Sequence, residues 1–463
     1  MQENKKRKGA GLEIIVVGCG KVGHTLVAEL VREGHNLTVI DTQPQVIANI
    51  QDSYDVMGVV GNGASLRVLE DAGLREADVL IAVTGSDELN LLCCTLARKG
   101  SDSLAAIARV RNPDYSEDLQ YLRKRLGLAM IVNPEMEAAR EISRLISRPQ
   151  ALAVSAFAKG QAELVRFRIP KDNVLVGKKV MDLDPFFGFG YLLCAVEREG
   201  HVSIPNGAFD LRAGDDISII TRAVDIHRVF DAIGMRTPAA KSCMIVGGGR
   251  ASYYLARRLI AQHMDVKIIE KDRARCNQLV TLLPQALIVC GDGSDEALLL
   301  EEGIETAESF ASLTGIDEEN VLLSLYAKAI PGLKTITKIN RIAFDSVLES
   351  LDLGSVVYPK HIIAEEIIAY VRARTHSVGS NVETLYQMSD GQVEAIEFHV
   401  QRGAPVIGIP LMEMKLKDEL RIACINRGGK ILFPRGQDRI EADDTVIVVT
   451  TQTGFADVAD ILR

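Results

Sequence analysis

The sequence predicts an α/β protein in which two doubly wound parallel sheets are each followed by a smaller α+β domain, through an internal duplication. Two observations support this prediction. Short β-branched apolar runs alternate with amphipathic helical stretches, a pattern typical of βαβ units. The same motifs also recur at a nearly constant spacing. With 463 residues, the chain has room for several domains of about 150 residues each.

The duplication is visible as matched motifs in the two halves of the chain. The matched pairs, with their spacing in residues, are Gly18 and Gly247 (229), Asp41 and Glu270 (229), Gly61 and Gly291 (230), and Thr84 and Thr314 (230). In the smaller domains, residues 204–207 pair with residues 433–436, and we align Asp216 with Asp444, 228 positions later. Such regular spacing indicates two copies of one unit.

The elements of the first half follow in order. Strands are predicted at 13–17, 37–40, 56–60, 79–83, 104–109 and 130–132, with helical stretches between them. Asn133 and Pro134 then open a long helix, because a capping side chain and a proline at the first position suit a helix start. Tyr358 and Pro359 begin the corresponding helix of the second half.

Each smaller domain alternates strands with Gly, Pro and Asp turns, which predicts a partly antiparallel sheet. The predicted strands are 164–169, 192–197 and 217–221 in the first copy, and 396–400, 420–426 and 445–450 in the second. We therefore expect a basic tail at 1–11 and four domains at 12–150, 151–238, 239–378 and 379–463.

Composition and charge argue against several classes of protein. Lys and Arg number 53 against 62 Asp and Glu, a net charge of −9, whereas broad nucleic-acid binding needs a basic surface. The apolar runs have the length of strands, far below the roughly 20 residues of a membrane span. The basic residues 5–8 have no apolar segment behind them and do not form a signal peptide. We expect a cytosolic protein that binds no nucleic acid.

Cysteine and histidine usage fits this expectation. The eight cysteines have no CxxC spacing, and the eight histidines form no HxxxH or HExxH pair. We therefore expect reduced, mostly buried thiols without disulfides, and no metal site.

A glycine-rich loop follows the first predicted strand, with an acidic residue at the end of the next strand. In such a GxGxxG motif the first glycine makes a tight turn, the second lets a pyrophosphate approach, and the third lets the helix pack on the strand. The helix start attracts phosphate, and the acidic residue binds ribose hydroxyls. Because Thr42 follows instead of an arginine, NAD(H) or an adenosine nucleotide is favoured over NADP. The candidate cofactor-binding residues are Gly18, Cys19, Gly20, Lys21, Val22, Gly23, Asp41 and Thr42.

The second half carries a weaker copy of this loop. Ser252 replaces the third glycine, and its side chain is expected to displace the helix slightly. Glu270 keeps the ribose acceptor, while Lys271 and Arg273 add positive charge for a phosphate. Whether the same ligand binds both halves stays open. The candidate residues of the second loop are Gly247, Gly249, Arg250, Ala251, Glu270 and Lys271.

Further candidates follow the third, fourth and fifth strands, because the carboxyl ends of parallel strands line one crevice. The segment 87–90 is expected to cap the following helix rather than to contact a ligand. Arg109, Arg111 and Lys338, which end fifth strands, either meet a phosphate or form salt bridges at the sheet rim. The candidates expected near the adenine are Gly61, Asn62, Gly63, Gly291 and Asp292, and those expected near the pyrophosphate are Thr84 and Thr314.

The sequence argues against catalysis. A dehydrogenase needs a proton donor or acceptor beside the nicotinamide, but the smaller domains contain no His/Asp or Lys/Tyr constellation, and His201 has no counterpart in the repeat. An NTPase would need a GxxxxGK[ST] loop, which is absent. We therefore predict no catalytic residues.

Several segments of the chain resemble the TrkA family, whose members are peripheral nucleotide-binding subunits of Trk-type potassium uptake systems. They are residues 16–23, 83–90, 107–115 and 255–259, and the resemblance extends from Glu13 to Arg463. It implies tandem RCK (KTN) domains in an N–C–N–C order and a regulator that binds NAD(H) or ATP/ADP. It also implies a ring on the inner face of the cell membrane, beneath an integral-membrane potassium channel or transporter subunit.

The resemblance further implies the number of chains in this assembly. A ring of eight RCK units would need four copies of the two-unit chain, with dimers in isolation. A free-standing nucleotide sensor with a soluble partner is the alternative function, followed by an NAD-dependent oxidoreductase.

Overall fold

A computed structural model describes residues 11–101, 103–116, 118–235, 237–238, 240–340, 348, 351, 353–375, 380–388 and 391–463. The basic residues of the expected N-terminal tail lie outside the described residues. The chain divides into two compact units, Met1–Ala138 with Tyr358–Ala364, and Ala139–Val357 with Glu365–Arg463. Each unit is described by itself.

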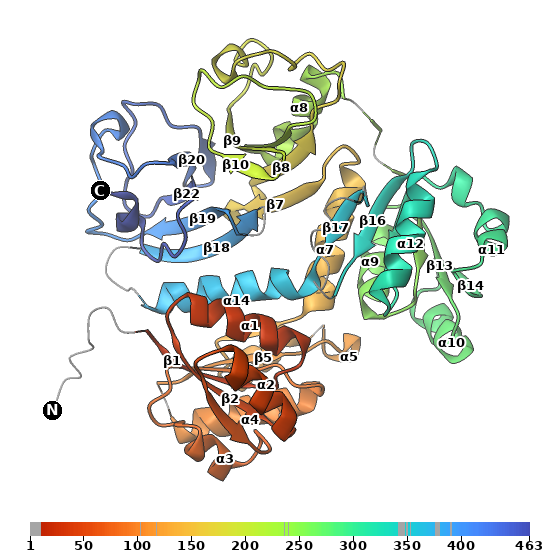
Figure 1. Ribbon diagram of the computed structural model, residues 1–463, viewed down its shortest axis with the longest axis vertical. Helices are drawn as coiled ribbons and strands as arrows, with labels where there is room; N and C mark the ends of the chain where they lie inside the picture. The colour runs from red at the N-terminus through yellow and green to blue at the C-terminus, as the bar shows by residue number, and fades with distance from the viewer. Residues whose placement is uncertain are drawn as a thin grey trace. The chain divides into compact units, whose positions relative to one another are not determined.

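The first unit, red and orange in Figure 1, is built on a six-stranded parallel sheet. Its strands are β1 (Glu13–Val17), β2 (Asn36–Asp41), β3 (Met57–Val60), β4 (Val79–Ala82), β5 (Ala105–Arg109) and β6 (Met130–Val132). The sheet order is β3-β2-β1-β4-β5-β6, and every pairing is parallel. This is the Rossmann order, in which the strand sequence reverses between β1 and β4 and opens a crevice there.

The helices of this unit connect the strands. They are α1 (Lys21–Arg32), α2 (Pro44–Ser53), α3 (Leu66–Asp71), α4 (Asp87–Gly100), α5 (Pro113–Ser116) and α6 (Leu119–Arg125), followed by the beginning of α7 (Pro134–Ser147). Helix α1 buries Leu26, Val27 and Leu30, a spacing that places apolar side chains on one helical face. That face fixes the helix, and with it the preceding glycine loop, against the sheet.

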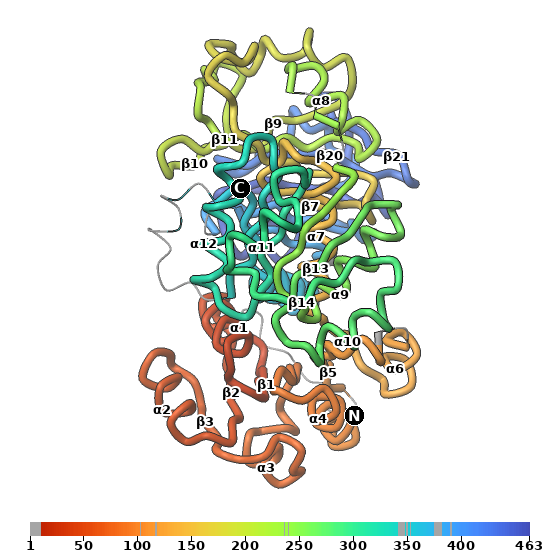
Figure 2. Tube along the Cα trace, turned by 90° about the vertical axis from the view of Figure 1, so that its right-hand side faces the viewer, coloured from red at the N-terminus to blue at the C-terminus, as the bar shows by residue number. Residues whose placement is uncertain are grey.

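The second unit contains a second parallel sheet of the same order, β14-β13-β12-β15-β16-β17. Its strands are β12 (Ser242–Val246), β13 (Asp265–Glu270), β14 (Leu287–Cys290), β15 (Ser309–Ser312), β16 (Lys334–Lys338) and β17 (Ser355–Val357). Its helices are α9 (Arg250–Ala261), α10 (Arg273–Leu282), α11 (Glu296–Glu301), the 3₁₀ turn η4 (Ile304–Thr306) and α12 (Asp317–Lys328), and α14 (Pro359–Thr375) follows β17. Figure 2 traces β13 and β14 with α9 and α10 in green. The predicted duplication of the doubly wound sheet is therefore confirmed.

Two five-stranded antiparallel sheets form the smaller domains of the second unit. The first contains β7 (Ala153–Phe157), β8 (Ala162–Arg168), β9 (Tyr191–Arg198), β10 (His201–Ser203) and β11 (Asp216–Arg222), with η1 (Ala158–Gly160), η2 (Val180–Asp182), η3 (Ala223–Asp225) and helix α8 (Ile226–Ala232). The second contains β18 (Ser380–Met388), β19 (Val393–Val400), β20 (Leu420–Arg427), β21 (Lys430–Leu432) and β22 (Thr445–Thr450), with η5 (Leu411–Glu413) and η6 (Val458–Ile461). Taken from β7 and from β18, both sheets have the same order, β7-β8-β11-β9-β10 and β18-β19-β22-β20-β21.

One ion pair occupies the same place in both smaller domains. Arg198 donates from Nε and Nη2 to the carboxylate of Asp215, both at 2.7 Å. Arg427 donates in the same way to Asp444, at 2.9 and 2.8 Å. Each carboxylate also accepts from a backbone N–H three residues before it, so the pair closes a turn before the last strand of each sheet.

This pair corrects the expected alignment of Asp216 with Asp444. The equivalent of Asp444 is Asp215, 229 positions earlier, and the preceding residues Gly214 and Asp443 share a positive φ of 85° and 67°. Asp216 instead begins β11 and accepts from two arginines of β8. Sequence alone misplaced the register by one residue, because two consecutive aspartates stand at both positions.

The two smaller sheets share one apolar core through equivalent faces. The contributing residues are Phe157, Ala162, Leu164, Cys194 and Ile220 from the first domain, and Met388, Val393, Ala395, Ala423, Cys424, Ile447 and Val449 from the second. Phe157 and Met388, and likewise Ala162 and Val393, stand 231 positions apart in paired strands of their own domains. Matching residues on both sides make this an internal, approximately two-fold interface.

A buried ion pair joins helix α14 to strand β19 of the second smaller domain. Arg372, which is 2% exposed, donates from both terminal nitrogens to the carboxylate of the fully buried Glu394 in β19, at 2.9 Å each. Bidentate geometry partly offsets the cost of removing both charges from water.

All eight cysteines are free thiols in the structure. All except Cys290 are buried, in agreement with the expectation of mostly buried thiols. Among the described residues, no group of three or more His, Cys, Asp and Glu side chains is arranged to hold a metal ion. Within the same part of the chain, no helix combines the length and the hydropathy required to cross a bilayer.

Candidate nucleotide-binding sites

The first glycine loop turns sharply at Gly18, directly after β1. Gly18 has a φ of +93°, and its N–H donates to the carbonyl oxygen of Ile40 at 2.8 Å. A Cβ added to Gly18 would lie 2.8 Å from the Cα of Thr84. Both the backbone conformation and the space therefore require glycine here.

The other two glycines of the motif differ in what surrounds them. A Cβ added to Gly23 would lie 2.0 Å from the carbonyl oxygen of Gly18, so α1 packs directly against the loop. A Cβ added to Gly20 would meet nothing within 4 Å, and Gly20 has a φ of −66°, which any residue adopts. Its small size is needed neither for the fold nor for the backbone, which leaves room for a group approaching from outside.

Asp41 fixes the far side of the loop from the end of β2. Its Oδ2 accepts from the N–H of Cys19 at 2.9 Å, and its Oδ1 accepts from the N–H of Gln43 at 3.0 Å. Each carboxylate oxygen retains a lone pair for a further donor. Burial, and then the charge of Asp41, raise the pKa of the Cys19 thiol to about 12, so this thiol stays protonated.

The remaining candidates of the first loop divide by exposure. Lys21 and Thr42 are exposed beside the loop, whereas the side chain of Val22 is buried in the core under α1. Only the backbone N–H of Val22 is therefore suited to a ligand.

The Gly61–Gly63 loop is held close to β1 and β2. The N–H of Gly61 donates to the carbonyl of Asp41 at 2.9 Å, and a Cβ on Gly63 would lie 2.3 Å from Cγ1 of Val17. Asn62 accepts from the N–H of Ala64 at 2.9 Å, which is an Asx turn. Packing thus explains the glycine at position 63, and the loop lies on the same sheet edge as the glycine motif.

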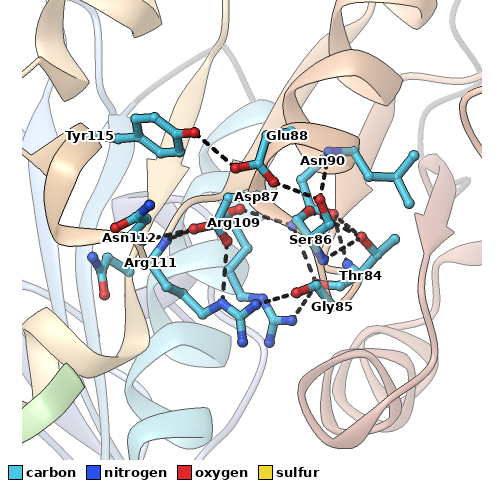
Figure 3. Close-up of polar contacts among 12 residues, drawn as sticks. Thr84, Gly85, Ser86, Asp87, Glu88, Asn90, Arg109, Arg111, Asn112 and Tyr115 are labelled. Carbon is cyan, nitrogen blue, oxygen red and sulfur yellow. Dashed lines mark hydrogen bonds and ion pairs between the residues drawn. The ribbon is translucent and has the colours of Figure 1, made fainter. Parts of the chain in front are cut away.

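A polar network ties the ends of β4 and β5 together (Figure 3). The Asn90 side chain accepts from the N–H of Thr84 at 2.8 Å and donates to the carbonyl of Arg109 at 2.9 Å. The carboxylate of Asp87 accepts from the N–H groups of Arg111 and Asn112, at 2.8 and 2.7 Å.

The expectation that residues 87–90 cap helix α4 was therefore wrong for Asp87 and Asn90. The capping side chain is that of Ser86, which accepts from the N–H of Leu89 at 3.2 Å. Asp87 and Asn90 instead bridge to the neighbouring strand end. This role can be recognised only once the fold is known.

The arginines at the end of β5 also turn inward to this network. Arg109 donates to the carbonyl oxygen of Thr84. Arg111 pairs with Asp87 at 3.3 Å and donates to the carbonyl of Gly85. Of the two alternatives left open by the sequence, the salt bridge at the sheet rim describes Arg111. Glu88 accepts from Ser86 and from Tyr115, and these hydrogen bonds lower the pKa of its carboxyl.

The second glycine loop repeats this geometry. Gly247 has a φ of +97°, and Glu270 accepts from the N–H of Gly248 at 2.6 Å and from the N–H of Asp272 at 2.7 Å. A Cβ added to Gly249 would meet nothing within 4 Å. Arg250 is exposed at the start of α9, and Ala251 is buried behind it.

Ser252 is accommodated at the position of the missing third glycine. Its hydroxyl donates to the carbonyl oxygen of Gly247 at 2.5 Å. In this hydrogen bond the hydroxyl oxygen of Ser252 lies between its own Cβ and the carbonyl oxygen of Gly247. The Cβ of Ser252 is therefore farther from that oxygen than the 2.0 Å found for a Cβ added to Gly23. This agrees with the expected displacement of the helix.

The second site carries more positive charge than the first. Lys271 and Arg273 are exposed. Arg275, which was not among the residues predicted from the sequence, donates from Nε to the carbonyl of Gly248 at 2.6 Å. Arg275 follows Arg273 by two positions on α10, and its basic character was the available signal. The pKa of Asp292 is lowered by hydrogen bonds from Ser294 and, to a smaller extent, by the charge of Lys271.

The remaining second-half candidates mirror the first half. Thr314 donates from its N–H to Asn320 at 2.8 Å, and Asn320 donates to the carbonyl of Lys338 at 3.0 Å. Lys338 donates from Nζ to the carbonyl of Leu313 at 2.9 Å. The N–H of Gly291 donates to the carbonyl of Glu270 at 3.0 Å. In each half, the candidate residues therefore lie at the carboxyl edge of that half's own parallel sheet.

Two doubly wound sheets, each with a glycine loop at its switch point, define a tandem Rossmann-type protein. The TrkA-N domain family matches residues 14–134 and 243–359, and the TrkA-C domain family matches residues 164–234 and 395–463. The chain therefore belongs to the TrkA family, as its resemblance indicated.

Relatives of this chain match it over nearly their whole length. A Trk system potassium uptake protein TrkA homolog from Archaeoglobus fulgidus is 30% identical over 452 residues, which cover 98% of this chain and 100% of the relative. The Trk system potassium uptake protein TrkA of Haemophilus influenzae is 30% identical over 444 residues, or 94% of this chain and 95% of the relative.

Solved structures share the fold. The GsuK channel bound to NAD superimposes with a TM-score of 0.62 at 16% identity, covering 96% of this chain and 77% of that chain. The GsuK RCK domain gives the same TM-score and identity and covers 96% of this chain and 93% of that chain.

Proposed function

We propose that this chain is the regulatory, nucleotide-binding subunit of a Trk-type potassium uptake system. Relatives that match the chain over nearly their full length are named as proteins of that system. A solved structure of the same fold is a channel bound to NAD. The proposal rests on one observation: the space beside Gly20 is open, and the carboxylate of Asp41 is held in place by a backbone N–H of the same loop. This combination is how Rossmann folds bind the pyrophosphate and ribose of a dinucleotide.

The proposed ligand is NAD(H), with ATP or ADP as the other adenosine nucleotides of suitable chemistry. In the first half, the open Gly20 admits the phosphates to the N-terminus of α1, and Lys21 adds a positive charge beside them. Asp41 accepts from the ribose with its remaining lone pairs. The second half offers Gly249, Arg250, Glu270 and Lys271 for the same contacts.

Regulation follows from linkage between the nucleotide and the shape of the assembly. A ligand shifts an equilibrium between two shapes only by its difference in affinity for them. A difference of about 1.4 kcal/mol changes the ratio of the two shapes tenfold. The network of Asp87, Asn90 and Arg111 is suited to transmit such a preference, because it couples the loops that border the site.

We propose a non-catalytic role. In the first half, two carboxylates near the loop are already engaged: Asp41 holds two backbone N–H groups, and Asp87 holds Arg111. The Cys19 thiol stays protonated because its pKa is about 12. The two carboxylates therefore hold the backbone in place, and neither they nor the protonated Cys19 thiol is activated as a nucleophile.

The proposed assembly is a ring of RCK units beneath an integral-membrane potassium channel or transporter subunit, on the inner face of the membrane. The chain would supply two units with the domain boundaries 12–150, 151–238, 239–378 and 379–463. Four chains would complete a ring of eight units. The family membership and the tandem fold support this arrangement.

The test is calorimetric titration of the purified chain with NAD, NADH, ATP and ADP, together with identification of any co-purified nucleotide. Gly20→Val is the informative variant, because a Cβ at this position meets no protein atom within 4 Å and the φ of Gly20 is ordinary. Gly249→Val is the matched control for the second half. Loss of one binding event in each variant supports the proposal, whereas unchanged titrations in both refute it.

A further inference from the structure

A pair of thiols lies beside the ribose-binding strand of the second half. Cys276 is buried in α10, and its Sγ is 3.2 Å from the carbonyl oxygen of Glu270. Cys290 is the exposed last residue of β14 and stands in register with Glu270 of β13. Both cysteines therefore lie beside Glu270, Cys276 on the adjacent helix and Cys290 on the neighbouring strand.

The first half shows that packing does not demand this pair. Its equivalent residues are Ile47 in α2, which is 4% exposed, and Val60 in β3, which is 50% exposed. Val60 stands in register with Asp41, as Cys290 does with Glu270. The same backbone positions therefore accept plain apolar side chains, so packing alone does not require thiols there.

We propose that Cys276 and Cys290 form a reversible redox pair that closes to a disulfide in the presence of a small disulfide oxidant of the glutathione class. The Cys290 thiolate attacks the oxidant, forms a mixed disulfide and releases one reduced thiol. The Cys276 thiolate then attacks the Cys290 sulfur and releases the second reduced thiol. Each cysteine loses one proton, and the two electrons reduce the oxidant.

The environment of Cys276 sets the speed of the second step. In the reduced chain, burial, followed by the hydrogen bond and charge of Cys290 and by the charges of Glu270 and Asp272, raises the pKa of the Cys276 thiol to about 11. Once Cys290 is in the mixed disulfide, its own contribution is lost, but burial and the charges of Glu270 and Asp272 keep the pKa of Cys276 raised. Because the thiolate is the attacking form, closure is slow at neutral pH and accelerates about tenfold per pH unit below that pKa.

Closure would constrain the second nucleotide site. The bond would join α10 to the residue that precedes the Gly291–Gly293 loop, and both cysteines adjoin Glu270. This consequence rests on the proposed function, whereas the disulfide itself does not. We expect the nucleotide affinity of the second half to change on the order of tenfold, within the range of coupled sites.

The test uses the full-length chain incubated with oxidised glutathione at mildly alkaline pH, alkylated, digested without reduction and mapped by mass spectrometry. We expect a cross-linked peptide pair containing Cys276 and Cys290, which dithiothreitol separates. Cys290→Val copies the first half and should show neither adduct nor cross-link. Cys276→Ala should keep a stable glutathione adduct on Cys290.

Two outcomes would overturn the redox pair: a stable glutathione adduct on Cys290 in the unmodified chain, or a Cys290 that stays unreacted. Nucleotide titration of the reduced and oxidised chains separates this proposal from the proposed function. A cross-link in a chain that binds no nucleotide in either state supports the redox pair and contradicts the proposed function.

Discussion

Ser252 donates its hydroxyl hydrogen to the carbonyl oxygen of Gly247 across 2.5 Å, and in this way closes the second glycine loop with a side chain. The first loop is closed by direct contact, because its Gly23 has no room for even a Cβ beside Gly18. The two copies therefore reach the same turn with different helix placements, and their substitutions should not be interchangeable.

Exchange of the two residues tests this asymmetry. Gly23→Ser should destabilise the first unit by about 2–3 kcal/mol, because the new Cβ would overlap the carbonyl of Gly18. Ser252→Gly should cost about 1 kcal/mol or less, since it removes one hydrogen bond and creates no clash. Urea unfolding followed by circular dichroism measures both. Equal costs for the two substitutions would contradict the difference in packing.

Asp41 should contribute to nucleotide affinity through its charge. Asp41→Asn keeps the shape of the side chain but replaces one acceptor oxygen with a donor, so we expect affinity in the first half to fall about tenfold. Titration in a Gly249→Val background isolates the first site. Glu270→Gln in the same background serves as the control and should leave the first-site affinity unchanged.

The buried Arg372–Glu394 pair should be costly to break from one side. Glu394→Gln leaves a buried guanidinium without its counter-charge, and we expect a loss of about 3–5 kcal/mol. The double variant Arg372→Met with Glu394→Gln should recover part of this loss, because no unpaired charge remains. Guanidinium chloride unfolding gives both values, and additive losses would argue against direct coupling.

Lys334 should make the free energy of unfolding depend on pH. Its Nζ donates to the carbonyl of Ala151 and to Ser355, and burial lowers its pKa from 10.5 to about 7. Between these two values the unfolded chain binds more protons, so this group makes stability rise with pH from about 7 to about 10.

The corresponding variant replaces the lysine with the residue of the first half, Ala105. The stability of Lys334→Ala relative to the unmodified chain should therefore be greatest near pH 7 and should decline as the pH rises. Thermal unfolding of both proteins at pH 7, 8 and 9 measures the trend. A difference that does not vary with pH would show that Lys334 keeps an ordinary pKa.

The fold could be predicted from the sequence because its signals are local. The glycine loop, the acidic strand end and the spacing of the repeat each have a direct physical meaning, and both parallel sheets are doubly wound, as predicted. The structural part of the glycine motif was also predictable: Gly18 turns and Gly23 packs.

What the sequence could not resolve depends on contacts between distant segments. Asp87 and Asn90 have the composition of a helix cap, and only the neighbouring β5 end reveals that they bridge two loops. Arg275 contacts the carbonyl of Gly248 because α10 returns to the loop. The face shared by the two smaller sheets was also hidden, since both faces of these strands carry apolar residues.

The shared core of the smaller sheets bears on the history of the chain. Each half presents to the other the surface that a single-copy ancestor would have presented to its twin. A polypeptide cut between the halves would leave that surface uncovered, and half-length chains would be expected to find copies of themselves. Gene fusion would then have turned a meeting between two molecules into a permanent arrangement inside one.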